Sequence, residues 1–123
     1  MQPLSGVKVL DLTRIVSGPF ATMLLGDLGA EIIKIEEPVS GDESRTYGPP
    51  FVNGESAYFL SINRNKKSCA INLKTPEGIA LIRELALKSD VLIENFRPGT
   101  LKKFGLSYEE LKKQNPGLIY CAI

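Results

Sequence analysis

Three short polar segments of this sequence combine residue types that can bind a phosphorylated ligand. Residues 13–19 end in Ser-Gly-Pro, a typical helix opening, where free backbone N–H groups and the helix dipole can meet a phosphate. Residues 63–67 read Asn-Arg-Asn-Lys-Lys, and residues 94–99 place an aromatic ring beside an arginine, with Lys102 and Lys103 a turn later. Cations can hold phosphates, and a purine can stack on a phenyl ring or a guanidinium plane. Each segment alone is equally compatible with a capped turn or a solvated loop. All three are expected on the same face of one parallel sheet, at the edge where ligands bind beyond the carboxyl ends of the strands, and together they favour a nucleotide-like ligand.

The residue types that are missing exclude several other kinds of site. The chain contains no histidine, which removes serine and cysteine triads and most zinc or iron sites. No GxGxxG turn follows the first apolar run, so Glu36, near the usual ribose-binding position, is weak support for a dinucleotide enzyme. We expect Asp11 to cap a turn rather than to catalyse, and Cys69 and Cys121 to be packed thiols. No metal site is expected.

The bulk composition is that of one globular domain. The 123 residues are 43% hydrophobic and 24% charged, with a formal net charge of +1, so no global field attracts nucleic acid or an anionic membrane. Apolar runs are broken by charge well before the ~20 residues that span a bilayer, and no targeting segment is visible. We expect a protein of the cytosol or the mitochondrial matrix.

Strand and helix signals alternate along the chain. Parallel strands joined by helices are the expected result, an α/β fold with a Rossmann-like, mainly parallel sheet and flanking helices. Residues 37–54 are expected to form a long loop, and the chain ends inside its last strand, so we expect a fragment of a longer protein. Expected strands cover residues 7–12, 30–36, 68–73, 90–93 and 118–123; expected helices cover 17–28, a segment opening at Thr75-Pro76, and 107–113.

Read together, these segments resemble the opening of family III CoA-transferases, the group of formyl-CoA transferase, carnitine CoA-transferase and α-methylacyl-CoA racemase. Within that group they are most similar to the transferases that use succinate and hydroxymethylglutarate. The similarity covers essentially the whole chain. It rests on residues 3–13, Gly18-Pro19, residues 26–36, Gly41-Asp42 with Arg45, residues 63–68 and residues 94–99.

The resemblance implies an incomplete large domain in residues 1–123, with the rest of that domain and a small domain absent. Coenzyme A or acyl-CoA is then a substrate, a small carboxylic acid is the acceptor, and no cofactor is permanently bound. One departure is Glu37, where many family members carry arginine. The implied CoA contacts are Val16, Ser17, Ile71, Asn72, Leu73, Lys74, Asn95, Phe96, Arg97, Lys103 and Phe104.

The resemblance also implies a mechanism and a quaternary structure. A nucleophilic aspartate, expected after Ile123, attacks the donor thioester to give an acyl-aspartyl anhydride before CoA moves to the acceptor acid. The full protein is expected to be an interlocked homodimer, and the fragment alone is expected to be inactive. Two alternatives stay open: a racemase of the same fold, and a non-catalytic fragment that binds CoA or a partner.

Overall fold

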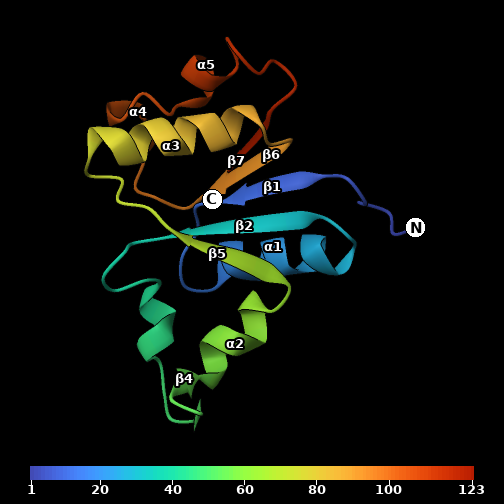
Figure 1. Ribbon diagram of the computed structural model, residues 1–123, viewed down its shortest axis with the longest axis vertical. Coiled ribbons are helices and arrows are strands. Elements are labelled where there is room, and N and C mark those ends of the chain that lie inside the picture. Colours follow the sequence, from blue (N-terminus) through green and yellow to red (C-terminus); the bar gives the residue numbers. More distant parts are fainter.

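The centre of the computed structural model, which describes residues 1–123, is a five-stranded sheet in which neighbouring strands all run parallel (Figure 1). Each strand forms from a short run that is rich in β-branched or aliphatic residues, except for the more polar third one. The α/β class predicted from the sequence is confirmed. The strands are β1 (Lys8–Asp11), β2 (Glu31–Glu36), β5 (Lys66–Ala70), β6 (Val91–Glu94) and β7 (Ile119–Ala122).

The order of the strands in the sheet is β5-β2-β1-β6-β7. From β1 at the centre, the chain first adds β2 and β5 on one side and then crosses over to add β6 and β7 on the other. The direction reverses between β1 and β6. In open parallel sheets, ligands bind beyond the carboxyl ends of the strands at such a reversal. The loops that follow β1 and β6 therefore meet where a ligand is expected.

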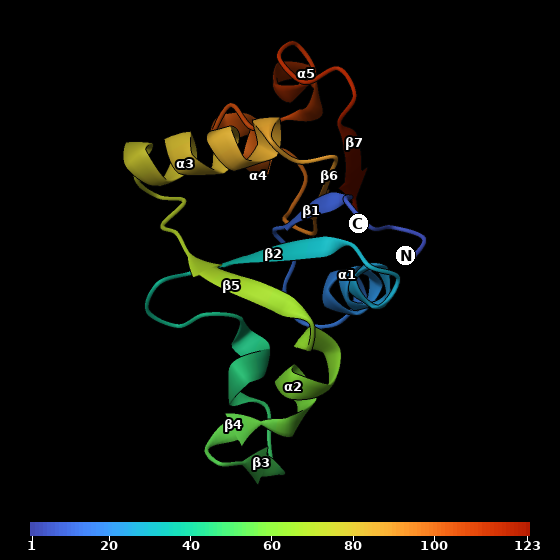
Figure 2. The ribbon, with the colours of Figure 1, turned by 45° about the vertical axis from the view of Figure 1, so that its right-hand side comes forward.

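Helices lie on both faces of the sheet (Figures 1 and 2). The helix α1 (Ser17–Asp27) lies on one face, and α3 (Pro76–Leu87), α4 (Thr100–Lys103) and α5 (Tyr108–Leu111) lie on the other. As predicted, Thr75 caps α3: its hydroxyl accepts a hydrogen bond from the N–H of Gly78 at 3.1 Å. The predicted cap of α1 is wrong, because the helix begins after Val16, and no side chain caps its first turn.

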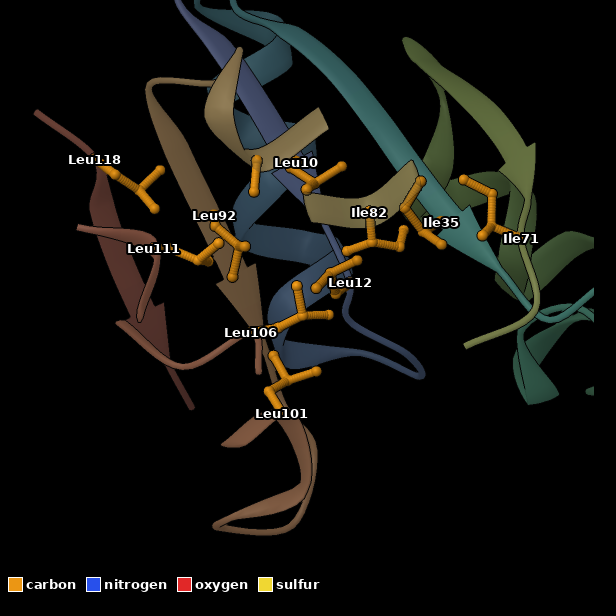
Figure 3. Close-up of a cluster of buried hydrophobic side chains, with 11 residues drawn as sticks. Leu10, Leu12, Ile35, Ile71, Ile82, Leu92, Leu101, Leu106, Leu111 and Leu118 are labelled. Carbon is orange, nitrogen blue, oxygen red and sulfur yellow. The ribbon is translucent and has the colours of Figure 1, made fainter. Parts of the chain in front are cut away.

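The sheet face under α3 is apolar. Side chains alternate between the two faces of a strand, so Leu10, Leu12 and Ile35 all point toward α3. There they meet Ile82 of the helix and Leu92 of β6 in one cluster of fully or largely buried side chains (Figure 3). The segments 100–111 and 118 close this cluster with Leu101, Leu106, Leu111 and Leu118.

The sheet face under α1 has a different chemistry. Val9, Ile32 and Ile93 form a small buried apolar cluster there. Farther along β1 and β2, the alternation of side chains places Asp11, Lys34 and Glu36 on this same face, and all three are buried. One face of the sheet is thus held by apolar contacts and the other, toward the carboxyl ends of its strands, by charges.

The segment predicted as a long loop, residues 37–54, is partly ordered into regular structure. It contains a 3-10 helix at Glu43–Thr46 and the first strand of a hairpin, β3 (Phe51–Val52) with β4 (Glu55–Ser56), which leads into the unpredicted helix α2 (Ala57–Asn63). These elements project from the sheet as a lobe (Figure 2). These elements are too short for a periodic pattern of apolar residues to predict them. The start of α2 is fixed by a local cap, in which the Ser56 hydroxyl accepts a hydrogen bond from the Phe59 N–H at 3.2 Å.

Three further features of the secondary structure differ from the sequence-based expectations. The third strand of the sheet, β5, begins at Lys66 rather than Ser68 and ends before Ile71. The helix α4 was not expected, since its four residues lack a capping side chain and follow Gly99 in a left-handed conformation. The capping box expected from Ser107 is not formed, although a short helix does follow that residue. No helix is long and apolar enough to cross a membrane.

Replacing Gly78 by alanine should destabilise the fold by about 1–3 kcal/mol, the usual cost of overpacking. A β-carbon at this position would overlap the backbone oxygen of Asn72, and a backbone atom cannot easily move away. This cost should exceed the gain of up to about 1 kcal/mol that alanine brings to a helix. Urea unfolding measures the difference. Gly117→Ala, where the nearest atom is 3.9 Å away, is the control and should leave the midpoint unchanged.

Candidate functional site

A cavity of about 260 Å³ lies at the carboxyl ends of the strands, next to the point where the strand order reverses. Pockets that hold a whole small ligand measure roughly 300–1,000 Å³, so this cavity suits one portion of a larger molecule. The loops after β1, β2, β5 and β6 all contribute to it. Its lining residues are Leu12, Arg14, Ile35, Glu36, Glu37, Ile71, Asn72, Leu73, Lys74, Phe96, Thr100 and Phe104.

The cavity combines an apolar lining with charged side chains of both signs. Half of its lining residues are hydrophobic, including Phe96 and Phe104. The guanidinium of Arg14 lies over the ring of Phe96, 5.3 Å from its centroid, and Lys74 lines the same cavity. Apolar and aromatic walls can take a flat heterocycle, and the two cations can neutralise a phosphate. A nucleotide-like ligand at this site stays a prediction from the sequence.

The structure brings only part of the predicted contacts together. Ile71, Asn72, Leu73, Lys74, Phe96 and Phe104 line the cavity. The other predicted contacts, Val16, Ser17, Asn95, Arg97 and Lys103, lie outside its lining, and Val16 and Ser17 are exposed where α1 begins. Lining residues that were not predicted as CoA contacts are Leu12, Arg14, Ile35, Glu36, Glu37 and Thr100. Of these, Arg14 belongs to the polar segment 13–19, and Glu36 and Glu37 were noted from the sequence for other reasons, whereas Leu12, Ile35 and Thr100 carried no signal.

The segment 63–67 does not belong to this site. Its first three residues precede β5, and Lys66 and Lys67 begin that strand, so the segment lies at the amino-terminal edge of the sheet, opposite the cavity. Its cations are paired within the fold: Arg64 contacts Asp27 at 2.6 Å, and Lys67 contacts Glu31 at 2.7 Å. The expectation that all three polar segments share one ligand-binding edge is therefore wrong for this one.

Asn95 ties the two central loops to each other. Its side-chain oxygen accepts from the N–H of Arg14 at 3.0 Å, and its amide group donates to the oxygen of the same residue at 2.9 Å. The loop after β6 thereby fixes the loop after β1 across the point of reversal. In this structure, the amide predicted as a ligand contact is used to bind the neighbouring backbone.

The first of three ion pairs with a buried carboxylate joins Asp11 to Lys66. The carboxylate of Asp11 is fully buried and accepts from Thr13, Thr22 and the Lys66 ammonium, which lies 3.3 Å away. Burial lowers the pKa of Lys66 to about 8, against the opposing effect of Asp11. Asp11 thus anchors the turn after β1, as expected from the sequence, and does not line the cavity.

The second pair joins Lys34 to Asp42 at 2.8 Å, with 1% of each side chain exposed. The ammonium of Lys34 also donates to the oxygen of Thr13 at 2.8 Å. The carboxylate of Asp42 accepts from the N–H and the hydroxyl of Ser44. Burial alone would raise the pKa of Asp42, but the hydrogen bonds from Lys34 and Ser44 hold it below its usual value.

The third pair joins Glu36 to Arg45 through two hydrogen bonds of 2.7 and 2.8 Å. Ser68 and the N–H of Asp42 also donate to this carboxylate. Burial alone would raise the pKa of Glu36, but these donors lower it to about 2. Since its carboxylate is saturated by protein donors, Glu36 is not available to bind a ribose.

Glu37, the departure noted from the sequence, has a local role. Its carboxylate accepts from the N–H groups of Ser40 and Val39 at 2.7 and 2.9 Å, which hold its pKa below the usual value. It therefore stabilises the turn after β2 at the edge of the cavity. No group of three or more potential metal ligands lies together anywhere in the fold.

Comparison with known proteins identifies relatives along the whole chain. Residues 4–123 match the model of CoA-transferase family III. The mouse (Mus musculus) succinyl-CoA:glutarate CoA-transferase is 59% identical over 100% of this chain and 28% of its own length. The succinate–glutarate CoA-transferase of Agrobacterium fabrum is 50% identical over 98% of this chain and 32% of its own. This chain thus spans about a third of these relatives or less.

A solved structure shows the same fold. The crystal structure of a CAIB/BAIF family protein from Brucella suis superposes with a TM-score of 0.93 at 50% sequence identity. The match covers 98% of this chain and 33% of that chain. A similarity this close extends to the sheet, its flanking helices and the loops that line the cavity.

Replacing Glu36 by glutamine should lower the free energy of unfolding at neutral pH by about 3 kcal/mol, because one pKa unit corresponds to about 1.4 kcal/mol. The pKa of Glu36 falls from 4.5 to about 2 on folding, so its contribution is complete above about pH 4.5. That contribution is lost as the pH falls toward 2, where variant and parent should converge.

Urea unfolding between pH 2 and 7 measures this difference. Glu84→Gln, which removes an exposed carboxylate paired with Lys88, is the matched control and should not shift the midpoint. A constant gap between parent and Glu36→Gln down to pH 2 would contradict the lowered pKa.

Proposed function

This chain belongs to CoA-transferase family III, and from that premise we propose that it supplies part of the coenzyme site of an enzyme that moves CoA from an acyl-CoA to a carboxylic acid. The observation that carries the proposal is the cavity at the strand reversal. Residues 71–74, Phe96 and Phe104 converge on it although they come from different loops. These are positions for which the family resemblance implied coenzyme contacts.

The chemistry of the cavity suits the nucleotide portion of CoA. The apolar wall and Phe96 offer surfaces for the adenine ring, while Lys74 and Arg14 offer positive charge for phosphates. The flexible remainder of the coenzyme would then extend along the loop after β1 toward Val16 and Ser17. Those two residues lie at the uncapped start of α1, where backbone N–H groups are available to a polar ligand.

We propose that the nucleophile is an aspartate in the part of the protein that follows Ile123. Its carboxylate would attack the thioester carbonyl of the donor, forming an acyl-aspartyl anhydride and releasing the CoA thiolate. The thiolate would then attack the aspartyl carbonyl of the anhydride, which releases the donor acid and leaves an aspartyl-CoA thioester. The acceptor carboxylate would attack this thioester to form a second anhydride and free the thiolate again, and attack of the thiolate on the acceptor's carbonyl would give the new acyl-CoA and the free aspartate. Residues 1–123 would hold and orient the coenzyme during these steps, and would be inactive alone. The names of the mouse and Agrobacterium relatives support dicarboxylic acids such as succinate and glutarate as donor and acceptor.

The test of this proposal is an assay of the full-length protein that contains this chain. Incubation with succinyl-CoA and glutarate should produce glutaryl-CoA and succinate in equal amounts, measured by liquid chromatography with mass spectrometry. The isolated residues 1–123 should give no product, because they lack the nucleophile. Deuterium uptake at the α-carbon of a branched acyl-CoA without CoA transfer would instead support the racemase alternative and contradict the proposal.

Replacing Lys74 by alanine in the full-length protein should weaken CoA binding about tenfold or more. A hydrogen bond to a charged group contributes about 1.5–3 kcal/mol, and 1.4 kcal/mol corresponds to a factor of ten in affinity. Isothermal titration measures the dissociation constant. Lys88→Ala, at the other end of α3 and away from the cavity, is the control and should bind as the parent does. Equal affinity of Lys74→Ala and Lys88→Ala would place the phosphates elsewhere.

A further inference from the structure

The loop between β1 and α1 contains a residue in an unfavourable conformation. Ile15 has a φ of 73°, in the left-handed region that β-branched residues rarely adopt. Its side chain does not explain this conformation, because Ile15 is 36% exposed and belongs to neither apolar cluster. Strained backbone of this kind persists only where the surroundings impose it, and it concentrates at functional sites.

The surroundings of Ile15 impose its conformation through side chains from elsewhere in the fold. The carboxylate of Asp42, in the lobe after β2, accepts from the N–H of Ile15 at 3.1 and 3.3 Å to its two oxygens. The preceding residue, Arg14, is fixed on both its N–H and its oxygen by Asn95. One residue earlier, the oxygen of Thr13 is bound by Lys34. Three consecutive residues are therefore fixed by partners distant in sequence.

The pair that holds this loop is costly to bury. Both Lys34 and Asp42 are 1% exposed, and a buried ion pair often stabilises a fold no better than apolar residues of the same size. Neither side chain lines the cavity, so neither is placed to contact a ligand there. Both side chains bind the backbone of the loop on either side of Arg14. Lys34 donates to the oxygen of Thr13, and Asp42 accepts from the N–H of Ile15. The pair is best explained by the loop that it holds.

We propose that Asp42, oriented by Lys34, is a positioning residue that keeps Ile15 in the left-handed conformation and so fixes where Val16 and Ser17 stand. This inference rests on the proposed function, in which those two residues lie beside the reacting end of the coenzyme. Asp42 acts on the reaction through the backbone alone. A change in the conformation of Ile15 would turn the chain at Val16 and move the start of α1 relative to the cavity.

The conformation of residue 15 can be changed without touching the buried ion pair. Glycine adopts a positive φ without strain, whereas proline fixes φ near −65° and has no N–H for Asp42 to accept. In the full-length protein, Ile15→Pro should lower kcat for CoA transfer at least tenfold relative to Ile15→Gly. The dissociation constant for the nucleotide portion of CoA alone, 3′-phosphoadenosine 5′-diphosphate, should differ less than threefold between the two, because the cavity that would hold it does not include residue 15. Equal kcat values in two folded variants would overturn the proposal.

A double-mutant cycle tests whether Asp42 acts through Ile15. Asp42→Asn keeps the shape of the side chain but removes its charge, and it should lower kcat at least tenfold in the parent. In the Ile15→Gly background, which carries no strain, the same change should cost at least threefold less. If the cost is the same in both backgrounds, Asp42 supports the fold in some other way and the proposal is wrong.

Amide hydrogen exchange separates this inference from the proposed function. In the parent, the N–H of Ile15 should exchange slowly, and Asp42→Asn should accelerate its exchange at least tenfold more than that of Leu10 in β1. This measurement does not need activity. Absence of CoA transfer by the parent would refute the proposed function and, with it, the effect of Asp42 on the reaction, whereas unchanged exchange at Ile15 in an active protein would refute the positioning role alone.

Discussion

The structure depends on three ion pairs, each with a buried carboxylate, along one face of its sheet: Asp11 with Lys66, Lys34 with Asp42, and Glu36 with Arg45. A buried charge is tolerated only when its partner and its remaining hydrogen bonds are in place. No buried polar side-chain atom is left without a partner here. Each pair joins a strand to another segment: to β5, to the lobe after β2, or to the 3-10 helix within that lobe. The pairs therefore specify relative positions more than they add stability.

The contrast between the two sheet faces explains how the fold presents a site. Under α3, apolar side chains such as Leu10 and Ile82 provide non-directional stabilisation that depends on area and fit. Under α1, the ion pairs and hydrogen bonds of charged side chains form only at particular distances and orientations between the segments. The loop after β1 lies where these two regions meet. Leu12 at its start belongs to the cavity wall, and the backbone of Thr13 and Ile15 is bound by the charged side chains of Lys34 and Asp42. An apolar cavity with a fixed charged edge is what recognition of a heterocycle carrying phosphates requires.

The lobe of residues 37–63 illustrates how little of such a segment local pattern reveals. Its elements are short, and its attachment to the sheet depends on Arg45, whose guanidinium binds Glu36 and lies 3.9 Å from the centroid of the Phe59 ring. Through Asp42, the same lobe controls the backbone of Ile15 on the neighbouring strand's loop. A segment that looked like a connecting loop thereby supports the geometry of the site.

The sequence by itself determined the class of the fold, the parallel strands and the capped start of α3, because apolar periodicity and helix caps are local properties. It also pointed to Phe96, through an aromatic residue beside an arginine, and to residues 71–74, through family resemblance alone. Only the tertiary structure decided which segments share an edge: residues 63–67 lie at the far end of the sheet, and Asn95 binds Arg14 across a separation of 81 residues. Which distant residues become partners depends on the three-dimensional path of the chain and on the requirement that buried charges be paired. Neither of these two constraints produces a periodic pattern in the sequence.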